Sequence, residues 1–175
     1  MGQKEGKPGP SKKEVETLIE DQLKMKNWDI QLNTFKCYPG LVFFAATEPD
    51  SFAHDRGDNV EGGIVDVKSN TAYKAHNKAV ASILATSLNE KHFRGGNDLP
   101  PLTDLLHAES MLYMHGGYYI TGFESRSGKL RPVNEGDDEP RVERNAEGWI
   151  ELKYQSYTVN EVPDPVSKNT KTFNF

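Results

Sequence analysis

The chain has 175 residues, with 21 Lys and Arg against 26 Asp and Glu and a formal net charge of -5, and this length suits one domain. The mildly acidic balance excludes nucleic acid as an expected primary partner, because such binding depends on clustered Lys and Arg that neutralise phosphates. The single cysteine excludes an internal disulfide framework and a cysteine-rich zinc site.

The first ten residues contain two prolines and three glycines, and we expect residues 1–10 to form a flexible lead. They lack the apolar stretch that a secretory signal needs. The longest apolar run of the chain, residues 41–46, is far shorter than the roughly 20 residues of a membrane-spanning helix. We therefore expect a cytoplasmic protein that does not enter a membrane, with a single domain over residues 11–162.

The N-terminal half combines a helical pattern with strand patterns. Ser11 and Glu14 form a capping-box pattern, and the apolar residues that follow at helical spacing predict an amphipathic helix to about Met25. From Trp28 the apolar residues alternate, which predicts a strand. Residues 41–46 are apolar without interruption, which predicts a central strand buried on both faces.

A polar stretch separates this central strand from a predicted hairpin. Residues 48–63 are rich in Asp, Gly and His and predict a loop, in which we interpret the glycine pair 62–63 as part of a turn. Residues 64–67 and 71–75 flank a short polar segment and predict a β-hairpin.

The second half begins with two helices and continues with strands. Asn77 and Thr103 are placed to cap a second helix and a third, shorter one. Strand patterns at residues 117–123 and 129–133 predict a hairpin, and residues 149–159 predict a long alternating strand.

Two C-terminal segments are expected to lie outside the regular structure. Residues 134–148 hold six acidic residues and two arginines, which predicts a mobile acidic loop, and residues 163–175 predict a loose tail anchored by Phe173 and Phe175. The order of elements predicts an α+β fold, a mainly antiparallel sheet with two to three helices packed on one face.

Candidate catalytic residues in the sequence give one alternative function. The sequence has no glycine-rich phosphate loop, and its five histidines have no metal-ligand spacing, so we expect no cofactor and no metal site. Nucleophilic catalysis would require Cys37 or a serine beside a histidine. Cys37 lies near a strand end with access to a cleft, although free cysteine is usually buried. A small hydrolase or transferase that uses Cys37 or His54 is therefore an alternative to a binding function.

Tyrosines in the predicted C-terminal strands favour a binding surface. Tyr118 and Tyr119 are adjacent in a strand and therefore point to opposite faces, and Tyr154 and Tyr157 also differ in parity. One tyrosine of each pair is expected on the outer face, where tyrosine is enriched at interfaces. The alternative explanation is the general preference of tyrosine for strands.

The acidic loop adds charge to this surface. Asp137, Asp138 and Glu139 would steer a basic partner, unless the loop is simply solvated. We predict a non-enzymatic protein-binding module without nucleic-acid or membrane partners; its oligomeric state stays open, and a structural subunit of a larger assembly is a second alternative. The predicted partner-binding residues are Tyr118, Tyr119, Tyr154, Tyr157, Asp137, Asp138 and Glu139.

A segment near the middle of the N-terminal half resembles a known family. Residues 40–76 contain an aromatic strand, a polar stretch and then a strand that turns into a hairpin, with Ile64, Val65 and Asp66 as the best-matching positions. This order resembles small bacterial immunity proteins that neutralise polymorphic toxins. The resemblance implies stoichiometric binding of a toxin without catalysis, as an immunity or anti-defence inhibitor, and it carries no functional residues over to this chain.

Overall fold

The computed structural model describes residues 9–49, 59–92, 98–113, 118–120, 123–124, 129–130, 140–158 and 166–174, and for residues 118–120, 123–124, 129–130, 157–158 and 166–167 it describes the backbone only. In this part of the chain the elements are α1 (Lys12–Leu23), β1 (Asp29–Asn33), β2 (Leu41–Thr47), β3 (Val60–Asp66), β4 (Thr71–Lys74), α2 (Ala79–Lys91), α3 (Leu102–Tyr113), β5 (Tyr118–Ile120), β6 (Phe123–Glu124), β7 (Lys129–Leu130), β8 (Arg141–Arg144), β9 (Ile150–Thr158) and β10 (Val166–Phe173). No helix in these ranges is long and apolar enough to cross a membrane.

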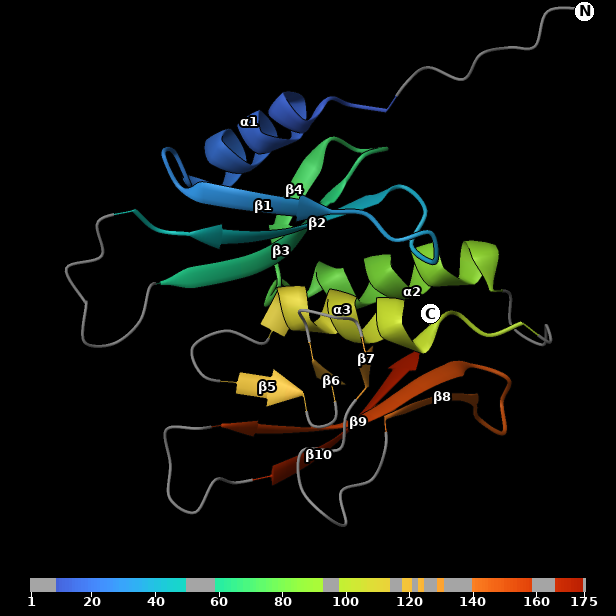
Figure 1. The fold of residues 1–175 in the computed structure, drawn as a ribbon. Coiled ribbons are helices and arrows are strands. Elements are labelled where there is room, and N and C mark those ends of the chain that lie inside the picture. Colours follow the sequence, from blue (N-terminus) through green and yellow to red (C-terminus); the bar gives the residue numbers. More distant parts are fainter. Residues whose placement is uncertain are drawn as a thin grey trace, which may run out of the picture.

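The elements stack in layers, with the helices α2 and α3 between two antiparallel sheets (Figure 1). The first sheet has the strand order β1-β2-β3-β4, and α1 lies on its outer side. The second sheet has the order β10-β9-β5, with β8 also paired to β9. The predicted α+β class is confirmed. One detail of the arrangement differs, because the helices cover both faces of the first sheet rather than one.

The strand β2 explains how two cores share one sheet. Its residues alternate between the faces, so that Phe43 packs into the core toward α2 and α3 while Phe44 packs into the core beneath α1. Both side chains are 0% exposed. The uninterrupted apolar sequence of β2 follows from this position, since a strand buried on both faces has no polar side to present.

The helix α1 packs as its sequence predicts. Ser11 caps it, with the Ser11 hydroxyl accepting a hydrogen bond from the backbone N–H of Glu14 at 3.2 Å. Val15 and Ile19, one turn apart, are buried against the first sheet. The helix ends at Lys24, which adopts the left-handed conformation with φ of 56°.

The central helices are apolar on more than one side because a sheet lies on each side of them. Leu105, Leu106 and Leu112 of α3 belong to one core that also contains Ile150 and Leu152 of the second sheet. This core therefore continues from the first sheet, around α2 and α3, to the second sheet. The helices begin near their predicted caps, and the Asn77 side chain accepts a hydrogen bond from the Ala79 N–H at 2.9 Å.

The glycine pair Gly62 and Gly63 corrects the predicted loop. Both residues lie inside β3 rather than in a turn. A Cβ on Gly62 would lie 2.2 Å from the Met111 carbonyl oxygen of α3, and a Cβ on Gly63 would lie 2.3 Å from the Phe44 ring. Gly62 thus allows the close approach of α3, and Gly63 leaves space for the Phe44 ring of the neighbouring strand. Composition alone does not distinguish this function of a strand glycine from a turn.

Two C-terminal predictions are also wrong. Residues 166–173 are not part of a loose tail but form β10, which pairs with β9 from Val166 to Phe173. Within the predicted acidic loop, Arg141–Arg144 forms β8 on the other side of β9. The predicted strand at residues 149–159 is confirmed as β9. Both errors have the same cause, because β8 and β10 are polar segments that become strands by pairing with β9. Phe173 is the predicted anchor, and it is 1% exposed in the central core.

Candidate functional site

A buried polar network connects α3 to the second sheet and includes one of the predicted tyrosines. The side chain of Glu109 is only 2% exposed. Its carboxylate accepts one hydrogen bond from Lys171 of β10 and another, at 3.1 Å, from the hydroxyl of Tyr154 of β9. Tyr154 is therefore directed toward α3 rather than into an outer surface.

Aromatic rings enclose the cation of this network. The ammonium nitrogen of Lys171 lies 5.1 Å from the centre of the Tyr113 ring and 5.5 Å from that of Phe173. Burial raises the pKa of the Tyr154 hydroxyl, and the charge of Glu109 raises it further, so this tyrosine stays neutral as a hydrogen-bond donor. The network joins secondary-structure layers and is a structural feature.

The remaining residues of the predicted binding site are described only in part. Tyr118 and Tyr119 lie on β5 and Tyr157 lies on β9, but their side chains are outside the described set. Asp137, Asp138 and Glu139 lie outside the described residues, as does His54. Their roles stay predictions.

The alternative nucleophile Cys37 lies in the central core. It is 1% exposed and clusters with apolar side chains that include Tyr38 and Phe43. Burial, with a smaller effect from the charge of Asp104, raises the pKa of the Cys37 thiol to about 12. A catalytic cysteine needs an accessible thiolate, so this geometry does not suit Cys37 as a nucleophile. In the described part of the chain, no group of three His, Cys, Asp or Glu side chains is placed to hold a metal ion.

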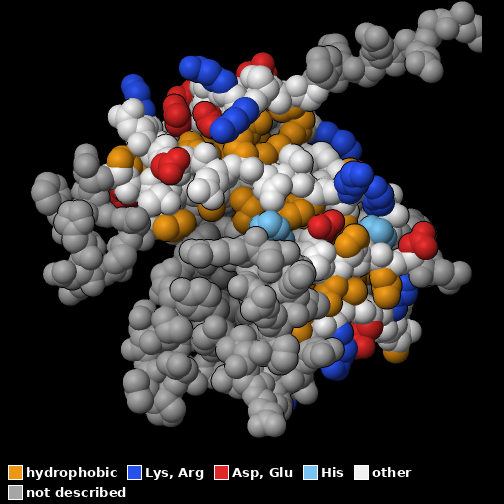
Figure 2. Space-filling view, viewed as in Figure 1, with side chains coloured by type: hydrophobic (Ala, Val, Ile, Leu, Met, Phe, Trp, Pro, Cys, Tyr) orange, Lys and Arg blue, Asp and Glu red, His pale blue; other side chains and the backbone are white. Residues whose placement is uncertain are grey.

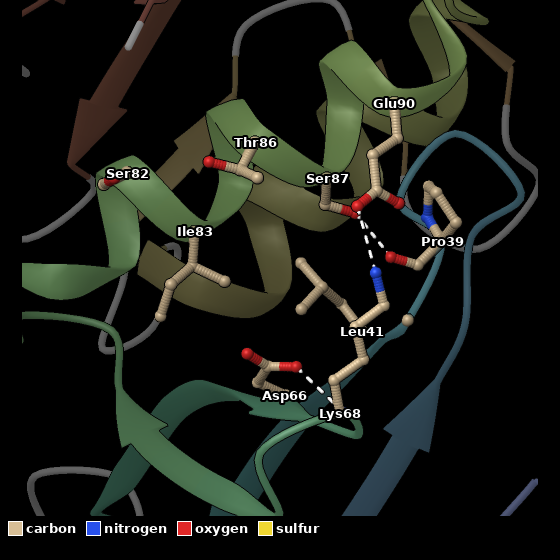
Figure 3. A pocket seen from close by; sticks show the side chains of 10 residues that line it. Pro39, Leu41, Asp66, Lys68, Ser82, Ile83, Thr86, Ser87 and Glu90 are labelled. Carbon is tan, nitrogen blue, oxygen red and sulfur yellow. Dashed lines mark hydrogen bonds and ion pairs between the residues drawn. The ribbon is translucent and has the colours of Figure 1, made fainter.

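A first groove, which we call the α2 groove, lies between α2 and the β3–β4 turn (Figure 3). It has a volume of about 180 Å³. The Ser87 hydroxyl donates a hydrogen bond of 2.7 Å to the Pro39 carbonyl, and Lys68 forms an ion pair of 3.1 Å with Glu90. These polar groups connect α2 to the first sheet across the groove. The α2 groove is lined by Pro39, Gly40, Leu41, Asp66, Lys68, Ser82, Ile83, Thr86, Ser87 and Glu90.

A second groove lies on the second sheet and has a volume of about 270 Å³. The pairing of the strands assembles it, since Arg141 of β8 and Thr170 of β10 are both in register with Lys153 of β9. In the next row, Gln155 of β9 is in register with Lys168 of β10. We call this the basic groove; it is lined by Arg141, Lys153, Tyr154, Gln155, Lys168, Asn169 and Thr170.

The alternation of β9 places the basic groove on the outer face of the sheet. Ile150 and Leu152 are 0% exposed and face the central helices. Lys153, one residue further along the strand, therefore faces the other way. The second sheet thus presents one face to α2 and α3 and carries the basic groove on the opposite face.

An acidic side chain beside the basic groove shows how its cations hold a carboxylate. Glu143 lies 2.6 Å from the ammonium nitrogen of Lys153 and 3.4 Å from Nε of Arg141. The hydrogen bond from Lys153, together with the charges of both cations, lowers the pKa of Glu143 below its ordinary value. Arg141 and Lys153 are therefore positioned to share one carboxylate.

The amide of Gln155 has an unpaired acceptor in the basic groove. Gln155 is 7% exposed, and its Oε1 is buried without a hydrogen-bond partner among the residues that the structure describes. Burying an acceptor in this way costs about 1–3 kcal/mol. A ligand with an N–H or O–H group would offset this cost on binding.

The basic groove is not predicted from the sequence, although the sequence contains one signal for it. The alternation of β9 separates Glu151, Lys153 and Gln155 from the apolar residues between them, which identifies a polar face. Arg141 and Lys168 lie on β8 and β10, and the polar composition of these two segments predicts a loop and a tail instead of strands. A groove built from three strands becomes visible only when their register is known.

Comparisons of this chain with protein-family models, with curated proteins and with solved structures found no match.

Proposed function

We propose that this chain is a non-enzymatic protein-binding module that binds its partner through the outer face of the second sheet. The observation that carries the proposal is the basic groove on this face, opposite the face that packs on α2 and α3. We call this surface the β8–β10 face; its residues are Arg141, Glu143, Glu151, Lys153, Gln155, Lys168, Thr170 and Thr172.

The dimensions and charges of the β8–β10 face favour a macromolecular partner. The basic groove, at about 270 Å³, is smaller than the roughly 300–1,000 Å³ of typical small-molecule pockets. Basic and acidic side chains alternate along β8 and along β9, and Lys153 forms ion pairs with both Glu143 and Glu151. Such a pattern suits a protein surface of complementary charge, because charge complementarity fixes the register of two partners and excludes wrong ones.

The predicted tyrosines belong to the same sheet. Tyr119 of β5 is in register with Tyr157 of β9, which has the same parity along β9 as Lys153 and Gln155. The proposal therefore keeps Tyr119 and Tyr157 as candidate partner-binding positions that extend the β8–β10 face.

The narrower proposal, an immunity or anti-defence inhibitor, rests on the resemblance at residues 40–76. Ile64 and Val65 are core residues of β3, and Asp66 accepts a hydrogen bond from the Lys68 N–H at 3.1 Å in the β3–β4 turn. These are structural roles, so the identity of a captured partner is the information that would support this narrower function.

The experiment compares protein capture from source-cell lysate by three forms of the tagged chain. Thr170→Trp places a bulky neutral side chain at an exposed position of the β8–β10 face. Thr17→Trp makes the same change at an exposed position of α1, whose surface carries basic and acidic side chains intermixed (Figure 2). α1 lies in the layer most distant from the second sheet (Figure 1).

The proposal predicts a protein that is captured by the unmodified chain and by Thr17→Trp but lost with Thr170→Trp. Circular dichroism checks that all three forms are folded. Capture that is equal for both tryptophan variants would contradict the β8–β10 face as the binding surface.

A further inference from the structure

We propose that the basic groove binds an extended acidic segment of the protein partner. In this arrangement a carboxylate of the segment contacts Arg141 and Lys153, and a backbone N–H of the segment donates to Oε1 of Gln155. The inference rests on the proposed function, since it names the chemistry by which the β8–β10 face recognises its partner.

The cations of the basic groove can hold a carboxylate in addition to Glu143. The side chain of Arg141 is 55% exposed, and its Nε lies 3.4 Å from a carboxylate oxygen of Glu143. A guanidinium has five N–H donors, more than one carboxylate can accept, so an exposed guanidinium can bind a second carboxylate. Lys168 adds a third basic side chain from the opposite strand. A carboxylate is therefore the group that the groove attracts.

Gln155 adds a requirement that a simple anion does not meet. Its Oε1 is buried and has no partner in the described part of the chain, and an acceptor can be satisfied only by a donor. A peptide carries carboxylates on its side chains and an N–H donor at nearly every residue of its backbone. The combination of cations with a buried acceptor thus fits an acidic peptide better than a free anion.

The spacing of the basic groove suits an extended conformation. Lys153 and Gln155 are two residues apart on β9, which corresponds to about 6.8 Å along a strand. Alternate residues of an extended peptide have the same spacing. A segment that lies along β9 can therefore present a side-chain carboxylate at Lys153 and a backbone N–H at Gln155.

The experiment titrates the full chain with fluorescein-labelled hexaglutamate and follows the fluorescence anisotropy. Hexaglutamine of the same length is the neutral probe. Arg141→Gln removes one charge from the basic groove, and Lys12→Gln is its matched control, because Lys12 is also exposed and also paired with a glutamate, Glu16. The net charge of the chain, -5, opposes non-specific binding of an acidic peptide.

The proposal predicts saturable binding of hexaglutamate, weakened about tenfold by Arg141→Gln, as expected for loss of a charge-assisted hydrogen bond. Lys12→Gln should leave the affinity within about twofold. Absence of binding, equal binding of hexaglutamine, or equal affinity of Arg141→Gln and Lys12→Gln would overturn the proposal. If free glutamate displaced the labelled peptide as effectively as unlabelled hexaglutamate does, the groove would be a site for small anions, and the proposal would also be overturned.

The two proposals fail in different ways. A partner that is lost with Thr170→Trp but captured fully by Arg141→Gln would leave the β8–β10 face as the binding surface and overturn the acidic segment. A partner captured equally by Thr170→Trp and Thr17→Trp would contradict the proposed function itself. Lys168→Gln, at an exposed position, repeats the test in case Arg141→Gln does not fold.

Discussion

Lys171 of the edge strand β10 points into the protein and forms an ion pair with Glu109 of α3. β10 is the terminal strand of its sheet, and on its far side no described strand pairs with it. Edge strands invite pairing with other chains, and an inward-pointing charge is one device that prevents such pairing. The Glu109–Lys171 pair therefore has two effects, since it fixes β10 against α3 and makes the edge a poor template for a foreign strand.

Removal of one partner from the Glu109–Lys171 pair should lower the free energy of unfolding strongly. Glu109→Ala leaves Lys171 next to the aromatic rings without its carboxylate, and the free energy of unfolding should fall by about 3–5 kcal/mol. The double variant Glu109→Leu with Lys171→Met replaces the pair by apolar groups. Its free energy of unfolding should fall much less, because neither charge then remains buried. Urea unfolding at neutral pH measures both changes. A double variant as unstable as Glu109→Ala would contradict this interpretation.

The close approach of β3 to α3 predicts a strong effect at a glycine. In Gly62→Ala the new methyl group would lie 2.2 Å from the Met111 carbonyl oxygen, which belongs to a helix backbone and cannot move alone. We expect a loss of about 3 kcal/mol or more, at or above the upper end of the usual cost of overpacking. Gly9→Ala is the control, since its methyl group would meet nothing within 4 Å. Thermal unfolding that shifts equally in both variants would contradict the close approach.

The burial of Cys37 predicts a slow reaction with thiol reagents. With its pKa raised from 9.0 to about 12, the fraction of thiolate at pH 8 is about 1,000-fold lower in the folded chain than in the unfolded one. Iodoacetamide should therefore modify the native protein very slowly and the urea-unfolded protein rapidly, as mass spectrometry can follow. Rapid labelling of the native chain would place Cys37 at a surface and restore the nucleophile hypothesis.

The same pKa shift has a consequence for stability at alkaline pH. A thiol that is harder to ionise when folded contributes stability that is complete below about pH 9 and is lost as the pH rises toward 12. Unfolding free energies of the unmodified chain should therefore fall more steeply above pH 9 than those of Cys37→Ala. Parallel pH profiles of the two proteins would contradict the shift.

Gln155 should show opposite effects on stability and binding. Gln155→Met removes a buried unpaired acceptor while it keeps the length of the side chain, and we expect the free energy of unfolding to rise by about 1 kcal/mol. The same change should weaken binding of hexaglutamate, because it removes the acceptor for the peptide N–H. Differential scanning calorimetry and anisotropy measure the two effects. A less stable variant with unchanged affinity would show that Gln155 has a structural role only.

The sequence correctly predicts the elements whose buried faces follow from their own apolar pattern. The strand β2 is apolar at almost every position because it lies between two cores, and α1 has a cap and one apolar face because it covers one side of one sheet. Local sequence patterns are sufficient in both cases. The hairpin of β3 and β4 is likewise confirmed, because a polar turn separates its strands.

The errors occur where neighbouring layers determine the structure. Gly62 is a residue type that is typical of loops, but it lies in a strand. A glycine is needed there because the α3 backbone leaves no space for a Cβ. The residues of β10 are polar because β10 is an edge strand whose inner face includes Lys171, and this charge is acceptable only with Glu109 opposite. The basic groove depends on the register of Arg141, Lys153 and Thr170, which belong to three strands. None of these relationships is local in the sequence.

The most direct test of the proposed binding surface is photo-cross-linking in source-cell lysate. The amino acid p-benzoylphenylalanine is placed at position 170, on the β8–β10 face, or at position 17, at the matched exposed threonine of α1. Irradiation should yield a discrete covalent adduct from position 170 that position 17 does not give. The same adducts from both positions, or an adduct from position 17 alone, would contradict the assignment of the β8–β10 face as the partner-binding surface.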